Sequence, residues 1–319
     1  MTPRISILIP CRHDAAALAR TLDHLGTLHG IEAAEVIVAA SDDRAGTERA
    51  AGGRARLLWP AGSTRARLMN AAAADARGAI LFFLHADSLP PRDALARIEA
   101  ALADPRAAGG AFEHLFTEPV WSLRAITYIN RARYRLTRNY YGDQGIFVRA
   151  AVFRAMGGYR DLALMEDLDF TQRLRRHGRR VLIREPLLTS GRRFLARGPW
   201  TTFFFIVWLL LLHTLRLDTR RYAERWRGPA DRAPGAPWPS RAPLGPTRTG
   251  DSTLLEQATH VTRRARGPRS NSQATLDPTR AGGPPRLEQA TLDPTRAGGP
   301  PRLEQATLDP TRAGSPRSK

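Results

Sequence analysis

The chain has 319 residues, of which 42% are hydrophobic, and it carries a formal net charge of +19 at pH 7. This length allows two domains or one large domain with a substantial core. The single cysteine, Cys11, excludes an internal disulfide and a cysteine metal cluster. All basic residues except Lys319 are arginines, which in an Ala-, Gly- and Pro-rich chain indicates coding bias. The positive charge still suits an anionic partner, such as a nucleotide diphosphate, an acidic membrane surface or nucleic acid.

The first third of the chain alternates short apolar runs with amphipathic segments. Apolar runs predict strands over residues 5–10, 35–40, 57–59 and 80–84. The segments between them are typical of helices, with clear examples at 15–25 and 64–76, the latter capped by Ser63. This alternation predicts right-handed crossovers and a mostly parallel sheet flanked by helices, an α/β fold of the Rossmann-like type.

The next hundred residues continue the pattern less regularly. Helices are expected at 94–102, 121–136, 150–156 and 166–177. Strands are expected at 109–116, 146–149 and 181–183. These elements extend the same α/β domain, for which we expect the boundaries 1–190.

Residues 191–227 contain an apolar segment of a different kind. Trp200–Leu212 is apolar all round and would form a helix about 20 Å long, too short to span a bilayer core of about 30 Å. Arg197 and Arg216 flank it, which favours a helix lying in or against a membrane surface. The alternative is a helix buried in the core or in a dimer contact.

Residues 228–319 are rich in Pro, Gly, Arg, Thr and Ser. A 16-residue repeat begins at Gln273, Gln289 and Gln305. Each copy has at most two leucines, so stacked copies could not bury a core. We therefore expect this tail to be disordered.

The strand at 80–84 leads directly into His85 and Asp87. A carboxylate at the carboxyl end of a buried strand lies where open α/β sheets hold their ligands. There it can hold Mg²⁺ or Mn²⁺, which neutralises phosphate oxygens. The alternative is that Asp87 and Ser88 cap the following helix.

Two polar clusters lie on either side of this strand in sequence. Arg67 and Asn70 share a helix face, which suits a diphosphate or a base edge, although they could equally form a solvated face. A turn with an aromatic flank could hold a sugar or form an ordinary hairpin; it contains Tyr141, Gly142, Asp143 and Gln144.

Glu166 and Asp167 open the helix at 166–177. Acidic residues in a first turn complement the helix dipole without any function. Two adjacent carboxylates cannot both point to water on one face, however, and one could enter a pocket as a general base. Such a base, with a metal carboxylate at Asp87, would serve an in-line displacement at a sugar carbon.

Five motifs occur together in this order: SILIP, RARLMNAAAA, FFLHADS, NYYGDQGIFVRAAVFRAMGGY and LMEDLDFTQRLRRHG. With these motifs the chain resembles the family-2 glycosyltransferases of the GT-A fold over residues 4–227. It is most similar to the bacterial branch described as "transferase 2, radical-SAM/selenodomain-associated".

The resemblance implies roles for individual residues. Asp87 would end the metal-binding acidic motif, with His85 in the place of its first acid, and Asp167 with Glu166 would be the base. The donor-binding positions implied are Pro10, Arg12, Asp14, Arg67, Asn70, Ala86 and Asp87. The acceptor positions implied are Tyr141, Gly142, Asp143 and Gln144.

The chain departs from the family pattern at two places. His13-Asp14 stands where Asn-Glu is common, and Ala39-Ala40 stands where an acid usually follows the second strand. The Gln-x-x-Arg-Trp signature of processive synthases is absent, which favours transfer of a single sugar.

We therefore expect an inverting glycosyltransferase that uses a nucleotide-diphosphate sugar and a divalent cation. The acceptor would be lipid-like, of polyprenyl or carotenoid type, and the protein cytoplasmic and peripheral on the inner membrane face, because the apolar start Ile5–Pro10 is too short for a signal peptide. The alternatives are a nucleotidyltransferase, a degenerate donor-binding protein, and a basic module that binds nucleic acid or membrane without catalysis.

Overall fold

The computed structural model of the protein describes residues 3–226. The chain divides into two compact units, Met1–Pro246 and Thr247–Lys319, and every described residue lies in the first. The tail 228–319, for which we expect disorder, lies outside the described residues.

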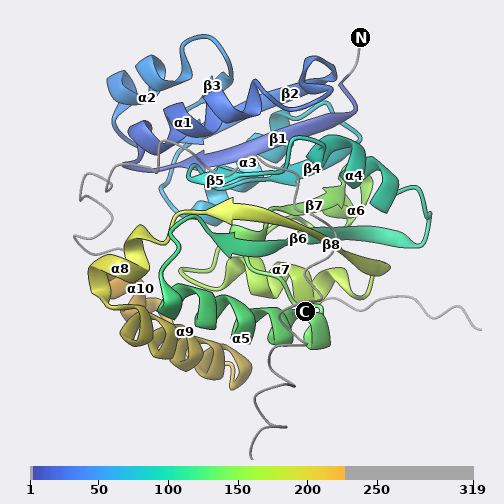
Figure 1. Ribbon diagram of the computed structural model, residues 1–319. Coiled ribbons are helices and arrows are strands. Elements are labelled where there is room, and N and C mark those ends of the chain that lie inside the picture. Colours follow the sequence, from blue (N-terminus) through green and yellow to red (C-terminus); the bar gives the residue numbers. More distant parts are fainter. Residues whose placement is uncertain (1–2, 227–319) are drawn as a thin grey trace, which may run out of the picture. The chain divides into compact units, whose positions relative to one another are not determined.

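One sheet of eight strands, in the order β3-β2-β1-β4-β7-β6-β8-β5, forms the centre of the described part (Figure 1). The strands are β1 Ile5–Cys11, β2 Ala34–Ala40, β3 Arg56–Leu58, β4 Ile80–Phe83, β5 Ser88–Leu89, β6 Ala107–Phe116, β7 Ile146–Arg149 and β8 Arg179–Thr189. The expected mixed α/β fold with helices flanking a sheet is confirmed.

Ten α-helices and two short 3₁₀ turns surround this sheet in residues 3–226. The α-helices are α1 Ala15–Leu25, α2 Arg44–Ala51, α3 Arg65–Asp75, α4 Ala94–Ala101, α5 Trp121–Thr137, α6 Ala150–Ala155, α7 Glu166–Leu174, α8 Arg192–Arg197, α9 Pro199–Thr214 and α10 Arg220–Trp226. The 3₁₀ turns are η1 Ile31–Ala33 and η2 Gly142–Gln144.

The first four strands form the predicted parallel half of the sheet. β1 pairs in parallel with β2 and β4, so that Ile5 lies opposite Ala34 on one side and Ile80 on the other. β7 joins β4 in the antiparallel sense, and β6 then pairs antiparallel with β7 and parallel with β8. Because β1 and β4 are central and parallel, their carboxyl ends open at the same edge of the sheet.

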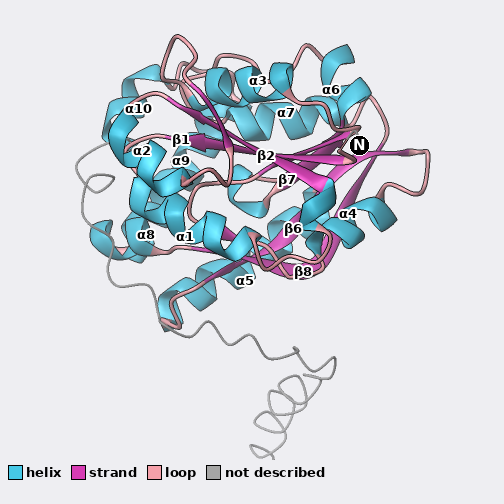
Figure 2. Ribbon diagram, turned by 90° about the horizontal axis from the view of Figure 1, so that it is seen from above, coloured by secondary structure: helices cyan, strands magenta, loops and turns pink. Residues whose placement is uncertain are grey.

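Alternate residues of β1 enter two separate cores, because successive side chains of a strand point to opposite faces. Ile7 packs in a cluster with α1 and α4, whereas Leu8 packs in a cluster with α3, α6 and α7. Figure 2 shows α3, α6 and α7 on one side of the sheet and α1 and α4 on the other. Burial on both faces explains why β1 is almost entirely apolar, with Ser6 its single polar residue.

The apolar segment at 199–215 forms α9, which packs on α5 and α8. Leu209 and Leu212 are buried, whereas Phe204 and Trp208 are exposed, so the helix is neither wholly buried nor wholly exposed. Among residues 3–226, no helix combines the length and apolarity that crossing a membrane requires.

Three local expectations are corrected by the structure. The N-cap of α3 is Thr64, whose side chain accepts a hydrogen bond from the Arg67 backbone N–H, not Ser63. Asp87 and Ser88 do not cap a helix, because Ser88 begins β5 and α4 starts at Ala94. β8 is far longer than the predicted 181–183.

Candidate functional site

A cavity of about 330 Å³ opens at the carboxyl edge of β1 and β4. Its polar wall comes from the ends of these strands, the first turn of α3, the η2 turn and the first turn of α7. Its polar residues include Arg12, His13, Asp14, Ser63, Arg65, His85, Asp87, Tyr141, Asp143, Glu166, Asp167, Arg192 and Arg193.

Most of the residues predicted for the site line this one cavity. Asp87 and the pair Glu166-Asp167 are distant in sequence but lie in the same wall. Pro10, Arg12, Asp14, His85, Ala86, Tyr141 and Asp143 also line it. Gly142 lines a smaller adjoining pocket with His85 and Asp167.

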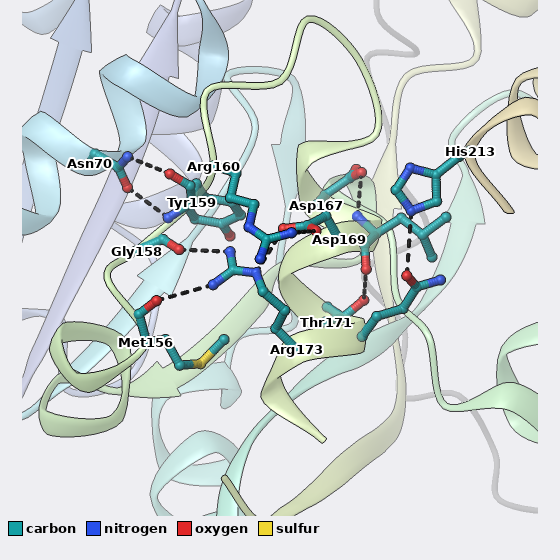
Figure 3. Close-up of polar contacts among 12 residues, drawn as sticks. Asn70, Met156, Gly158, Tyr159, Arg160, Asp167, Asp169, Thr171, Arg173 and His213 are labelled. Atoms are coloured by element: carbon teal, nitrogen blue, oxygen red, sulfur yellow. Dashed lines mark hydrogen bonds and ion pairs between the residues drawn. The ribbon is translucent and has the colours of Figure 1, made fainter. Parts of the chain in front are cut away.

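Arg67 and Asn70 do not line the cavity. The Asn70 amide donates to the Tyr159 carbonyl at 2.8 Å and accepts from the Tyr159 backbone N–H at 2.9 Å (Figure 3). Arg67 donates to Asp161 at 2.6 Å on the exposed surface. Both residues hold the loop before α7 against α3, so they support the site without lining it.

Gln144 is buried, and its side chain forms hydrogen bonds with backbone groups. Its amide nitrogen donates to the Phe112 carbonyl at 3.0 Å, and its Oε1 accepts from the Tyr141 backbone N–H at 3.0 Å. The residue therefore fixes the η2 turn to β6, while Tyr141 and Asp143 from the same turn face the cavity.

Arg65 is a central residue of the site that the sequence analysis missed. Its Nε donates to Oε1 of Glu166, and its Nη2 lies 3.6 Å from Oδ2 of Asp167. Its Nη1 lies 2.8 Å from Nε2 of His85. Arg65 and Arg67 are two positions apart on α3 and so face different sides of the helix. No feature of the sequence distinguishes the arginine that faces the cavity.

The contact with Arg65 defines the protonation of His85. A guanidinium can only donate, so Nε2 of His85 accepts and the ring proton lies on Nδ1. Burial, with the neighbouring charges of Arg65 and Arg193, holds the pKa of His85 well below its usual range. The ring is therefore neutral, and in this arrangement its Nε2 lone pair already accepts from Arg65 instead of facing a metal.

Asp87 lies in the turn between β4 and β5, with its Oδ2 3.7 Å from Nη2 of Arg192. Burial raises the pKa of its carboxyl to about 6, against the opposing charge of Arg193. A raised pKa indicates a carboxylate whose charge is incompletely compensated by the protein, and a cation would compensate it.

The residues fit a divalent cation held by Asp87 together with substrate oxygens. No group of three His, Cys, Asp or Glu side chains within residues 3–226 is arranged as a complete metal site. Mg²⁺ is usually bound through one or two carboxylates plus substrate phosphates, so a single carboxylate is compatible with such an ion.

Arg192 connects α8 to the loop after β1. Both its terminal nitrogens donate to the carboxylate of Asp14. Arg192 and Arg193 both line the cavity. With Arg12 they place positive charge in the wall of the cavity, and guanidinium groups suit the binding of an anion.

Asp167 is held by backbone donors. Its Oδ2 accepts from the Gly142 N–H at 2.6 Å, and its Oδ1 accepts from the Leu168 N–H at 2.7 Å. Met165, the N-cap residue of α7, has a left-handed φ of 64°, which turns the chain sharply into the helix. Burial, with the adjacent charge of Asp167, raises the pKa of Glu166 although Arg65 opposes the shift.

The structure resembles solved glycosyltransferases at low sequence identity. The mannosyltransferase PcManGT from Pyrobaculum calidifontis, in complex with GDP-Man and Mn²⁺, is 17% identical, over 82% of this chain and 81% of that chain, with a TM-score of 0.48. S. aureus TarS 1–349, in complex with UDP-GlcNAc, is 13% identical, over 59% of this chain and 58% of that chain, with a TM-score of 0.47. A search of curated proteins found no match.

The sequence itself matches a family model. Residues 6–157 match the model described as glycosyl transferase family 2, a range that contains Asp87 and ends before Glu166. The narrower bacterial branch stays a prediction. Residues 6–157 of the chain are therefore similar to the glycosyl transferase family 2 domain.

Proposed function

We propose that the protein transfers a single sugar, with inversion, from a nucleotide-diphosphate sugar to a hydroxyl group of an acceptor. The observation that carries this proposal is that Asp87 and the Glu166-Asp167 pair line one cavity. The acceptor hydroxyl attacks the same sugar carbon that the diphosphate leaves. The base that takes the hydroxyl proton and the group that assists the diphosphate must therefore lie close together, and one shared cavity allows this.

The donor diphosphate would lie beside Arg12, Arg192 and Arg193, whose charges all face the cavity. Asp87 would hold a divalent cation, which when bound neutralises charge on the leaving diphosphate. The acceptor hydroxyl would give its proton to Asp167 as its oxygen bonds to the anomeric carbon. The bond to the diphosphate oxygen breaks with its electron pair, and a single displacement inverts the configuration of that carbon.

Asp167 is the better candidate for the base than Glu166. The Glu166 carboxylate is 3% exposed as a residue and is engaged by Nε of Arg65. Asp167 lines the same cavity as Glu166, but it is held by the Gly142 and Leu168 N–H groups, and its side chain is 10% exposed against 4% for that of Glu166. In this proposal Glu166 keeps Arg65 in position and Asp167 receives the proton.

We further propose that the protein contacts the cytoplasmic face of a membrane through α9, and that its acceptor is lipid-like, of the polyprenyl or carotenoid type. The outward side chains Phe204, Val207, Trp208 and Leu211 are exposed, and Arg216 after the helix is also exposed. Apolar side chains flanked by cations suit an interface with anionic lipids. The protein should co-sediment with anionic vesicles, and Trp208→Ser should reduce the bound fraction. An unchanged bound fraction in Trp208→Ser would refute this contact.

A thermal-shift panel of nucleotide-diphosphate sugars, with and without Mn²⁺, tests the proposed activity. A ligand that binds only the native state raises the melting temperature, so one donor class with Mn²⁺ should stabilise the protein. If no donor stabilises the protein and it instead binds DNA in a salt-sensitive manner, the basic non-catalytic module is the better account.

A further inference from the structure

The cavity has a second, apolar wall that a nucleotide-diphosphate sugar would leave uncovered. This wall consists of Phe116, Phe194, Phe203, Ile206, Leu209 and Trp226. The first residue ends β6, and the others come from α8, α9 and α10. It shares one continuous cavity with Asp167, the proposed base.

Most residues of this wall pack in two small apolar clusters. Phe116 and its neighbours Phe194 and Phe203 belong to a cluster with Leu123 and Ile126 of α5. Leu209 and Trp226 belong to a second cluster, built around Leu164. Ile206 lies between Phe203 and Leu209 along α9, so the helix joins both clusters across the cavity.

One face of α9 lines the cavity, and the other is exposed on the surface. Phe203, Ile206 and Leu209 are three residues apart in turn and line the cavity. Phe204, Val207, Trp208 and Leu211 are between 43% and 62% exposed and lie on the opposite side of the helix, given 100° of rotation per residue. The cavity-facing side is therefore a distinct surface from the exposed stripe.

Trp226 closes the wall at the end of the described residues. It stacks on Phe205 with the ring centroids 6.1 Å apart, and the guanidinium carbons of Arg193 and Arg197 lie 4.9 and 5.9 Å from its ring centroid. An aromatic ring fixed by such contacts forms a rigid apolar contact surface at little cost in conformational entropy.

We infer that this wall is an acceptor subsite that binds a hydrocarbon chain next to the acceptor hydroxyl. This inference rests on the proposed function, and it adds where the apolar part of the acceptor lies. A diphosphate gains nothing from six apolar side chains, whereas an alkyl or isoprenoid segment gains free energy for each methylene it buries there. The polar wall then positions the hydroxyl at Asp167, and the apolar wall positions the chain behind it.

The test is calorimetric binding of hexyl, octyl and decyl β-glucoside, each below its micelle concentration, to the full chain without vesicles. Burial of a methylene group in the subsite should raise the affinity about fourfold per added CH₂. Ile206→Gln, which places an amide in the wall, should remove most of this dependence on chain length. Val207→Gln, the matched change one residue away on the exposed side, should leave it unchanged.

The location is checked on the wild-type chain with an octyl glucoside that carries a diazirine on its alkyl end. Labelling should fall on Phe203 and Ile206 and spare Phe204 and Leu211, and this result does not depend on whether Ile206→Gln folds. Affinity that is independent of chain length, or that falls equally in both variants, would overturn the inference, as would labelling of the exposed side. Donor binding in the thermal-shift panel is measured separately, so donor stabilisation without alkyl binding overturns only the subsite.

Discussion

The backbone N–H of Gly142 donates a 2.6 Å hydrogen bond to Oδ2 of Asp167, which joins the η2 turn to the first turn of α7. A Cβ atom on Gly142 would lie 2.6 Å from Nε2 of His85 and 3.3 Å from Oδ2 of Asp167. Position 142 therefore requires glycine because two side chains of the site approach its backbone closely.

Gly142→Ala should lower kcat by about 10- to 100-fold, because displacement of a positioned group by a fraction of an ångström to 1 Å has effects of this size. Steady-state kinetics with the donor found in the thermal-shift panel measures it. Gly26→Ala is the control, since a Cβ there meets nothing closer than the Asp23 carbonyl at 3.4 Å and φ is −60°. Equal rates for Gly142→Ala and wild type would show that the contact does not position Asp167.

Asp167→Asn should reduce transfer by about 10²- to 10⁴-fold, the usual contribution of a general base, while donor affinity stays within a few-fold of wild type. Single-turnover transfer and equilibrium donor binding separate the two effects. Asp23→Asn removes an exposed carboxylate that pairs with Arg54 away from the cavity, and should leave transfer unchanged. Retained turnover in Asp167→Asn would move the base to Glu166 or elsewhere.

Arg65→Gln should destabilise the protein by about 2 kcal/mol, because it leaves the buried Glu166 carboxylate without its partner. Adding Glu166→Gln should restore part of that loss, giving a coupling energy of about 1 kcal/mol in a double-mutant cycle measured by urea unfolding. The same cycle on Arg67 and Asp161, whose side chains are both exposed, should give a coupling below about 0.5 kcal/mol. Additive effects at Arg65 and Glu166 would contradict the role assigned to their contact.

Asp87→Asn should stabilise the protein at pH 7.5 in the absence of donor and cation. Burial raises the pKa of Asp87 to about 6 from an ordinary value near 3.8, so the native state binds this proton more tightly than the unfolded chain. The stability that protonation contributes is present below about pH 4 and lost as the pH rises through 6. The advantage of Asp87→Asn should therefore shrink by about 2 kcal/mol between pH 7.5 and pH 4, as measured by urea unfolding. A difference independent of pH would contradict the shifted pKa.

Periodicity in the sequence predicts many of the helices and the central strands, because β1 and β4 are buried on both faces and are almost entirely apolar; it did not predict α8 or α10. It predicts β8 poorly. Arg184, Glu185 and Pro186 interrupt the apolar pattern, and the pairing with β6 jumps from Ile183 to Pro186 at an irregularity in register. This segment is a strand because it pairs with β6 and, at its end, with β5, and that information is not local.

The acidic positions of the candidate site follow from sequence motifs, whereas their partners do not. Asp87 follows the apolar run that contains β4, and Asp167 lies in the first turn of α7, so the sequence indicates both. Arg65 was missed in favour of Arg67 because the choice depends on which side of α3 meets α7. The apolar wall was missed because it forms only when α8, α9 and α10 meet the end of β6.

Donor binding as a function of cation tests the shared cavity most directly. The measurement is calorimetric titration of the stabilising nucleotide-diphosphate sugar into wild type and Asp87→Asn, each with Mn²⁺ and with chelator. The account predicts that Mn²⁺ raises the donor affinity of wild type at least tenfold, which corresponds to about 1.4 kcal/mol. Asp87→Asn should lose this gain, because it lacks the carboxylate that holds the cation. The same Mn²⁺ dependence in both proteins, or none in wild type, would contradict it.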